Sequence, residues 1–169
     1  APQQNPRRRA EHRATTATTP SATPQPIAYT EIPKRFTGAS SWIKSSNLLC
    51  WSCGQRVESY PRFVPMYPEK DSNGEDVCDV HGHFCEWSCA VRYATKELPH
   101  VADVLESISL FESKFTGRRR WMIPPAPPKT QLKQYCGATG ITPEQWKGKL
   151  AQMNTEYALG QYQMKHHKT

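Results

Sequence analysis

The sequence predicts a small α+β domain with additional C-terminal helices and long irregular extensions. Two close cysteine pairs, within CWSCG at residues 50–54 and FCEWSCA at residues 84–90, predict a compact centre. Between them lie two β-prone runs around Asn73-Gly74, and helical periodicity begins after His100. A hydrophobic fraction of 37% and 15 prolines predict a small core and long connections.

The N-terminal segment, residues 1–40, is dominated by Pro, Thr, Ala, Gln and Arg and contains almost nothing to bury. Such a composition predicts an arm that is disordered alone and becomes ordered on a partner. Six Lys or Arg residues against two acidic residues give this arm a net charge of +4. Its arginines are candidates for contact with nucleic acid or a larger protein assembly: Arg7, Arg8, Arg9 and Arg13.

Positive charge is distributed unevenly along the chain, whose formal net charge is +7. Residues 41–100 carry six basic and eight acidic residues, whereas residues 101–169 carry ten and five. Attraction to phosphates must therefore come mainly from the flanks. Because there is no apolar run of about 18 residues and no apolar N-terminal run, we expect no membrane span and no secretion signal. The default expectation is then an intracellular, reducing compartment.

Residues 41–116 are predicted to form the central domain. The stretch RFVPMYPEKDSNGEDVCDVHGHF contains two β-prone runs around Asn73-Gly74, a pair typical of tight hairpin turns. The stretch EWSCAVRYATKEL after Cys85 is compatible with a helix that stops at Pro99. We therefore expect a β-hairpin followed by a helix.

A second helix is predicted after His100, since its apolar residues fall on one stripe at helical spacing. Asp103, Glu106 and Glu112 lie away from that stripe. The helix should pack on the cysteine-containing segment or on a partner. The stripe comprises Val101, Val104, Leu105, Ile108, Phe111 and Phe115.

Residues 117–130, GRRRWMIPPAPPKT, form a basic and proline-rich linker. Its basic and aromatic side chains are candidates for nucleic-acid or partner binding, because a tryptophan can stack on a base and arginines pair with phosphates. These residues are Arg118, Arg119, Arg120 and Trp121.

Residues 131–169 are predicted to form a C-terminal helical unit with a basic tail. The segment ITPEQW, residues 141–146, combines a Thr N-cap, a Pro at the first helical position and a Gln three residues after the cap. Ile141 is positioned to contact Trp146 across this helix start. Gly160 is the expected stop.

The two cysteine pairs predict one structural Zn²⁺. A CxxC pair followed by Gly54 is typical of a zinc knuckle, whose tight turn often needs a positive φ. The second pair has the spacing that places both sulfurs on one face of a first helical turn, where the helix N-terminus favours thiolates. The result is a zinc-stabilised, treble-clef-like arrangement of knuckle, hairpin and helix with ligands Cys50, Cys53, Cys85 and Cys89. Binding on the order of 10–16 kcal/mol would offset a core too small to fold unaided.

Other interpretations of these residues stay open at this point. The four cysteines could instead be reduced side chains, two of them buried in the core. Nearby Cys78, His81 or His83 could replace a ligand or form a second site, although such residues are more often packing or surface groups. Cys136 has no ligand-like neighbour and is expected to be structural. Trp51 and Trp87 are interpreted as core residues beside the metal.

The segment FCEWSCAVRY, preceded by Gly82, by CWSCG and by the intervening YPRFVPMYP, resembles the FCS-type (MYM-like) zinc finger. That finger is found in the late transcription factor two-like proteins of nucleocytoplasmic large DNA viruses. The resemblance covers residues 47–95 and, more loosely, 129–148, where QLKQYCGATGITPEQW is similar to the family's C-terminal segment. One departure is Glu86, which stands where the family motif has Ser. The resemblance implies the same four cysteine ligands.

The resemblance implies a viral protein with a role in late gene expression, acting in the host cytoplasm or a viral factory through protein and nucleic-acid contacts. An alternative is a virion structural component, a minor capsid or cement protein whose arm and linker thread between larger subunits. We expect no enzymatic activity and no small-molecule substrate, since the sequence has no GxSxG, phosphate-binding loop, HExxH or deaminase HxE motif.

Overall fold

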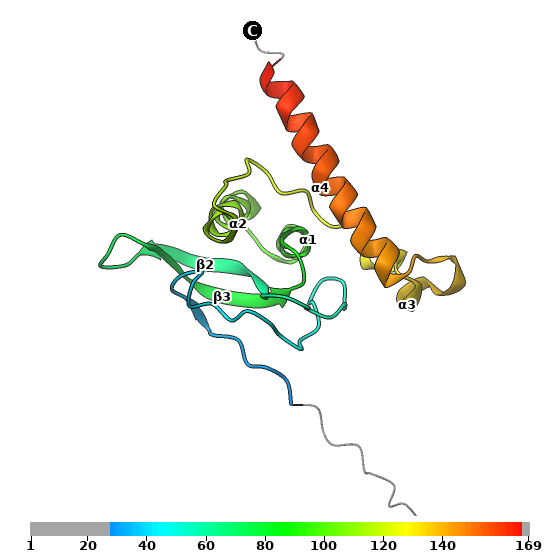
Figure 1. Ribbon diagram of the computed structural model, residues 1–169, viewed down its shortest axis with the longest axis horizontal. Coiled ribbons are helices and arrows are strands. Elements are labelled where there is room, and N and C mark those ends of the chain that lie inside the picture. The colour runs from blue at the N-terminus through cyan, green and yellow to red at the C-terminus, as the bar shows by residue number, and fades with distance from the viewer. Residues whose placement is uncertain (1–27, 167–169) are drawn as a thin grey trace, which may run out of the picture.

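The computed structural model describes residues 28–166, and the side chains of residues 28–158. In it, two helices cover one face of a three-stranded antiparallel sheet, and a C-terminal helical unit lies beside them (Figure 1). The strands are β1 (Arg35–Phe36), β2 (Arg62–Lys70) and β3 (Asp76–Phe84). The helices are α1 (Trp87–Glu97), α2 (Val101–Thr116), α3 (Lys133–Cys136) and α4 (Pro143–His166), with 3-10 turns at Lys129–Gln131 and Gly137–Thr139. The fold is therefore small and α+β, as predicted.

The predicted hairpin is confirmed by the pairing of β2 with β3. The carbonyl of Asp71 accepts a hydrogen bond from the Gly74 amide at 3.0 Å. The Asp71 carboxylate accepts two more, from the amides of Asn73 at 2.8 Å and Glu75 at 2.9 Å. Gly74 has a φ of +77°, which a glycine adopts without a side-chain penalty. Local turn chemistry thus positions the two strands.

Strand β1 corrects the predicted boundary of the arm, because Arg35 and Phe36 lie inside the segment assigned to residues 1–40. Phe36 pairs with Cys78 of β3, and its side chain is only 1% exposed. A single aromatic residue in a polar segment has no periodic signal, so its burial depends on distant pairing that the local pattern does not reveal. The arginine candidates of the arm (Arg7, Arg8, Arg9 and Arg13) lie outside the described residues.

Helix α2 has the predicted apolar face, with Ile108 and Phe111 fully buried. Glu112, which lies away from the apolar stripe, is nevertheless buried, at 3% exposed. It is buried because Arg120 binds both of its carboxylate oxygens, at 2.7 and 2.5 Å. A paired charge is tolerated in an interior where an isolated one is not.

An aromatic cluster fills the space between the sheet and the two helices. We define it as Phe36, Trp42, Phe63, Trp87 and Phe111. The Trp42 and Phe63 ring centroids are 5.0 Å apart, those of Phe36 and Phe111 5.4 Å. The Trp42 indole nitrogen donates to the carbonyl of Pro61 at 2.9 Å. The core is therefore larger than the composition predicted, because few but bulky side chains supply it.

The predicted linker, residues 117–130, packs against the domain. Ile123 is 3% exposed and Ala126 2% exposed, and the Ala126 amide donates to the carbonyl of Ser88 at 2.9 Å. This segment therefore belongs to the core that α1 covers.

The helix start in the C-terminal unit is confirmed. The Thr142 amide donates to Gln145 Oε1 at 2.8 Å, and the Gln145 amide donates to Thr142 Oγ1 at 3.2 Å, a reciprocal capping box. The predicted stop at Gly160 was wrong, since α4 runs to His166 and projects from the domain (Figure 1). None of the helices within residues 28–166 has the length and hydropathy needed to cross a membrane.

Candidate metal centre

The first cysteine pair lies in a tight turn between Leu48 and Val57. The Cys50 amide donates to the carbonyl of Gln55 at 2.8 Å, and the Gly54 amide donates to the carbonyl of Cys50 at 2.9 Å. Gly54 has a φ of +74°, as expected for such a turn. A Cβ at this position would collide with the hydroxyl of Tyr135. This knuckle therefore requires glycine for both its conformation and its packing.

The second pair lies where β3 meets α1. Cys89 is in the first turn of α1, and its amide donates to the carbonyl of Glu86 at 3.1 Å. Cys85 was predicted to share that turn, but it precedes the helix, which begins at Trp87. Glu86 has extended backbone angles and separates the strand from the helix. The two thiols therefore converge from a strand end and a helix, and not from one helical face.

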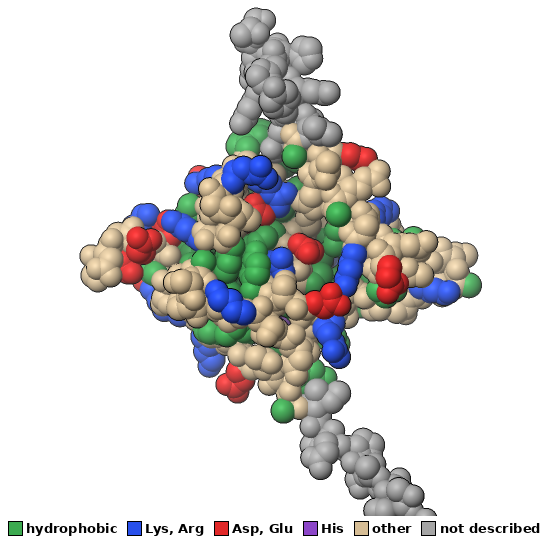
Figure 2. All heavy atoms as spheres, in the orientation of Figure 1, with side chains coloured by type: hydrophobic (Ala, Val, Ile, Leu, Met, Phe, Trp, Pro, Cys, Tyr) green, Lys and Arg blue, Asp and Glu red, His purple; other side chains and the backbone are tan. Residues whose placement is uncertain are grey.

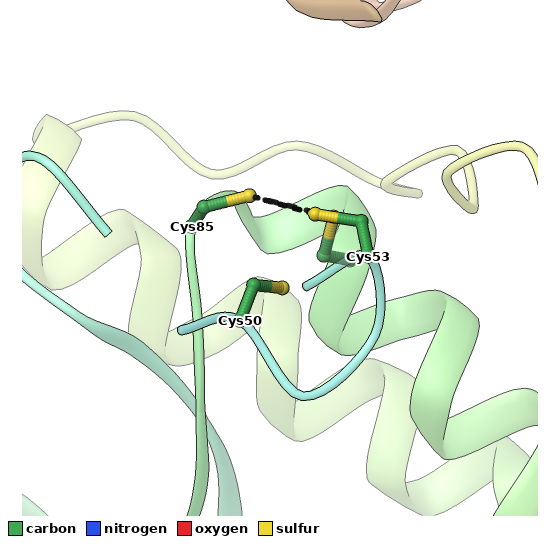
Figure 3. Close-up of side chains that lie close together, drawn as sticks. Cys50, Cys53 and Cys85 are labelled. Carbon is green, nitrogen blue, oxygen red and sulfur yellow. Dashed lines mark hydrogen bonds between the residues drawn. The ribbon is translucent and has the colours of Figure 1, made fainter. Parts of the chain in front are cut away.

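The four cysteine sulfurs all lie within 4.8 Å of one another. Cys53 and Cys85 sulfurs are 3.5 Å apart, and those of Cys85 and Cys89 are 3.7 Å apart. Figure 3 shows the thiols of Cys50, Cys53 and Cys85 pointing toward one another. Four thiolates at the usual Zn–S distance of about 2.3 Å in a tetrahedron would have sulfurs about 3.8 Å apart. The arrangement fits one tetrahedral metal ion held by Cys50, Cys53, Cys85 and Cys89.

Burial and mutual contact give these thiols unequal acidity. Burial opposes ionisation of Cys50, but hydrogen bonds from Cys53, Cys85 and Cys89 outweigh it and lower the pKa of Cys50. The contacts with Cys50, and next with Cys53, raise the pKa of both Cys85 and Cys89. Ionisation of Cys85 and Cys89 is therefore opposed in the absence of a compensating cation. A divalent metal would supply that compensation.

The other candidate ligands do not join the cluster. Cys78 is fully buried in β3, and burial, followed by the charge of Asp79, raises its pKa to about 12. His81 Nε2 lies 3.2 Å from the hydroxyl of Tyr93. His83 lies edge-on to Trp51, with ring centroids 5.5 Å apart. Within the described residues, the group that could hold a metal contains four cysteines and no histidine.

The two tryptophans beside the cysteines differ. Trp87 is 4% exposed and its indole nitrogen donates to the hydroxyl of Tyr60 at 3.2 Å, which confirms a core position. Trp51 was interpreted in the same way, but it is 47% exposed. Its amide donates to the carbonyl of His83 at 3.0 Å, so the knuckle backbone pairs with β3 while the ring stays at the surface.

The basic candidates of the linker also differ from one another. Arg120 is occupied by Glu112 and by Asn154, whose Oδ1 lies 2.6 Å from its Nη1. Its role is therefore structural, since its guanidinium links α2 to α4. Arg118 and Arg119 are exposed, and Trp121 is 74% exposed. Only these three of the four linker candidates remain accessible to a partner.

Sequence reasoning missed Tyr135, which supports the knuckle from outside. Its hydroxyl donates to the carbonyl of Cys53 at 3.1 Å, and the ring fills the space beside Gly54. The only signal in the sequence was the absence of a side chain at Gly54. That signal does not say which residue approaches, because the contact joins residues far apart in the chain.

Comparisons with known proteins point to a viral relative. The chain is similar to the uncharacterized protein B175L of African swine fever virus. The Pretoriuskop and Badajoz versions are each 33% identical over 109 residues, which is 63% of this chain and 62% of the relative. A version from Kenya is 32% identical over the same length. The chain thus matches less than two thirds of the length of these relatives. No family model and no solved structure matches the chain. The protein is therefore homologous to a protein of a large DNA virus.

Proposed function

We propose that the protein is a non-enzymatic zinc protein that acts through contacts with other macromolecules. One structural Zn²⁺ would join the knuckle to the junction of β3 and α1, in the manner of a treble-clef, FCS-type finger. The observation that carries this proposal is the convergence of four thiols, from segments far apart in the chain, to within 4.8 Å of one another. Four thiolates are the ligand set of closed, structural zinc sites.

A structural role fits the coordination better than a catalytic one. A catalytic zinc site keeps a position for water or substrate, whereas four cysteines fill a tetrahedral shell. Three of the thiols are buried, and the fourth, Cys85, is partly buried. The metal would therefore contribute to folding, by holding the knuckle against α1.

A role in viral late transcription is the form of this proposal that the sequence resemblance favours. The homology to a protein of a large DNA virus supports a viral setting. Exposed Arg118, Arg119 and Trp121 would contact nucleic acid together with the arginines of the N-terminal arm. The alternative, a minor capsid protein, loses part of its support because the proline-rich segment packs on its own domain and does not extend from it.

Metal analysis tests the zinc centre directly. Purified full-length protein should contain about one Zn²⁺ per chain, and removal with a strong chelator should disorder the knuckle. Hydrogen exchange of the amides of Cys50 and Gly54, both of which are hydrogen bonded here, reports that disorder. A folded, metal-free protein whose knuckle amides stay protected would contradict the proposal.

Salt dependence tests the nucleic-acid contact. Binding to duplex DNA should weaken steeply between about 50 and 200 mM salt, because phosphate contacts release counterions. Replacing Arg118 and Arg119 with Ala should weaken binding and flatten that dependence. Affinity that does not change with salt would exclude this part of the proposal and leave the zinc centre untouched.

A further inference from the structure

A groove with a volume of about 780 Å³ separates α4 from the rest of the domain. Its walls come from the knuckle, the start of β2, the start of α1, the end of α2 and residues 146–158 of α4. Figure 2 looks onto this side of the molecule, where hydrophobic side chains lie between α2 and α4 among acidic and basic ones. The volume is in the range of ligand sites, roughly 300–1,000 Å³.

Two buried donors in this groove have no partner. They are Arg62 Nε and Trp146 Nε1, and no other buried side-chain nitrogen or oxygen in the described part of the chain lacks a hydrogen bond. Both residues line the groove, and Trp146 is only 1% exposed. An unsatisfied buried donor costs about 1–3 kcal/mol. Their coincidence in one groove points to an occupant that supplies acceptors.

The groove is net positive. Its lining includes five basic side chains (Arg56, Arg62, Arg118, Arg120 and Lys147) and three acidic ones (Glu58, Glu86 and Glu112). Glu112 forms an ion pair with Arg120, and Glu58 forms one with Lys147 at 2.6 Å. Arg62 Nη1 donates to Ser59 Oγ at 2.7 Å and to the carbonyl of Tyr60 at 3.0 Å, while Arg62 Nη2 has a distant ion pair with Glu86 at 3.8 Å. The occupant is therefore expected to carry negative charge.

The aromatic side chains of the groove do not offer a free face to a nucleobase. Tyr60 is stacked on Phe115 at 4.4 Å, and the Arg62 guanidinium lies 4.0 Å from the ring centroid. Trp87 and Trp146 are almost fully buried. Recognition of single-stranded nucleic acid relies on stacking against such faces. The groove instead combines apolar surface with donors, which suits an extended peptide.

We propose that this groove binds an extended, acidic segment of a partner protein. A main-chain carbonyl of the segment accepts from Trp146 Nε1, its acidic side chains pair with Arg62 and Arg56, and its apolar side chains contact Leu150 and Ala151. The chain's own arm is unsuited, since residues 1–40 carry a net charge of +4. This inference deepens the proposed function by naming the partner chemistry of a macromolecular contact.

A short fluorescein-labelled peptide in which Glu and Leu alternate is the probe, measured by fluorescence anisotropy with the full-length protein. A peptide in which Lys replaces Glu is the matched control and should bind at least tenfold more weakly. Arg56→Glu should weaken binding of the acidic peptide about tenfold. Lys34→Glu reverses an exposed charge outside the groove and should change it less than about twofold.

A pair of tryptophan variants tests the unpartnered donor. Trp146→Phe removes an indole N–H that has no partner, whereas Trp42→Phe removes one that already donates to the carbonyl of Pro61 and lies outside the groove lining. Both variants lose similar ring volume. The affinity for the acidic peptide should fall about fivefold in Trp146→Phe and stay within about twofold in Trp42→Phe. Equal losses in the two variants would overturn the assignment.

Competition experiments identify other occupants. Displacement of the peptide by single-stranded DNA, or its exclusion by self-association in sedimentation experiments, would overturn the proposal in favour of nucleic acid or a second copy. Zinc content is measured on the same samples. A protein that contains zinc but binds neither peptide refutes the groove alone, whereas peptide binding without zinc refutes the zinc centre alone.

Discussion

The cysteine knuckle and the aromatic cluster are two regions of one domain that differ in what stabilises them. In the knuckle, Leu49 and Trp51 are 52% and 47% exposed, and its inward contacts are the four thiols, the Tyr135 hydroxyl on the Cys53 carbonyl and edge-on contacts of the Trp51 ring with β3 and α1. In the aromatic cluster, Phe36, Phe63 and Phe111 are at most 1% exposed and contact one another. The knuckle should therefore depend on metal far more than the cluster does.

This difference changes what the cysteines are expected to do. The composition predicted a core too small to fold without a metal. The structure places several large aromatic rings between the sheet and the helices, and each such ring buries much apolar surface. The proposed metal would then have a more local role, which is to join the knuckle to β3 and α1. Four sets of variants test how independent the two regions are.

The largest effect is expected from Cys89→Ser, which removes a fully buried thiol of the proposed zinc site. Most of a metal-binding free energy on the order of 10 kcal/mol should be lost. Zinc content should fall to near zero, and the knuckle amides should lose protection against hydrogen exchange. Cys78→Ser is the control, since Cys78 is equally buried but lies outside the cluster, and it should retain zinc. If Cys89→Ser kept its full zinc content, the knuckle could not be said to depend on a metal held by Cys89.

Phe63→Ala tests the other region. It removes a fully buried ring from the aromatic cluster and should lower the free energy of unfolding by about 3–5 kcal/mol. Zinc should remain at one ion per chain in the folded fraction. Denaturant unfolding together with metal analysis measures both quantities. Tyr67→Ala, on the same strand but 76% exposed, should cost less than about 0.5 kcal/mol. Loss of zinc from folded Phe63→Ala would show that zinc binding by the knuckle depends on packing in the aromatic cluster.

Arg120→Ala should destabilise the contact of α2 with α4 by about 3 kcal/mol. It leaves the buried carboxylate of Glu112 without its partner, and an uncompensated buried charge is costly. Arg119→Ala is the matched control, because its partner Glu106 is 76% exposed and 3.7 Å away. Adding Glu112→Gln to Arg120→Ala should recover stability in thermal unfolding. If the double variant is no more stable than Arg120→Ala, the buried charge is not the cause.

The smallest effect is expected at Asp76, whose side chain is 11% exposed between Lys70 at 2.7 Å and Lys114 at 2.5 Å. Burial opposes ionisation of Asp76, but the two lysines outweigh it and lower its pKa. Because the pKa of Asp76 is lower in the folded state than in the unfolded state, its ionised form stabilises the fold. This contribution is fully present above the unfolded-state pKa of about 3.9 and is lost as the pH falls through the folded-state pKa. Asp76→Asn should therefore cost about 1 kcal/mol at pH 7 and nothing at pH 2.

Urea unfolding of both proteins across that pH range measures this difference. Zinc release in acid affects both proteins alike and cancels in the comparison. Asp79→Asn, which removes a half-exposed ion pair with Arg35, should cost less stability at pH 7 than Asp76→Asn. A difference between Asp76→Asn and the unchanged protein that persists at pH 2 would mean that charge at Asp76 is not its origin.

Much of the fold and the site could be predicted because the signals are local. Paired cysteines, the turn at Asn73-Gly74 and the capping box of α4 each depend on neighbours in the chain. The apolar stripe of α2 is also a local pattern. Such features predicted the hairpin, the start of α4 and the residues of the cysteine cluster.

The features that could not be predicted depend on contacts between distant residues. Phe36 is buried only because β1 pairs with β3, and Glu112 only because Arg120 reaches it from the following segment. Gly160 did not end α4, since the helix propensity of its neighbours outweighed the cost of about 1 kcal/mol for one glycine. Cys85 was assigned to a helical turn because spacing alone does not distinguish a helix from a strand end.

Helix α4 is attached to the domain as far as Tyr157, because Trp146 and Leu150 are buried, Asn154 bonds Arg120 and the Tyr157 hydroxyl contacts Met122. At a rise of about 1.5 Å per residue, His166 lies about 14 Å along the axis from Tyr157. A change of about 10° in the axis direction at Tyr157 would displace that end by only about 2 Å. The contacts that hold the first part of the helix therefore also fix the direction in which its last turns leave the domain.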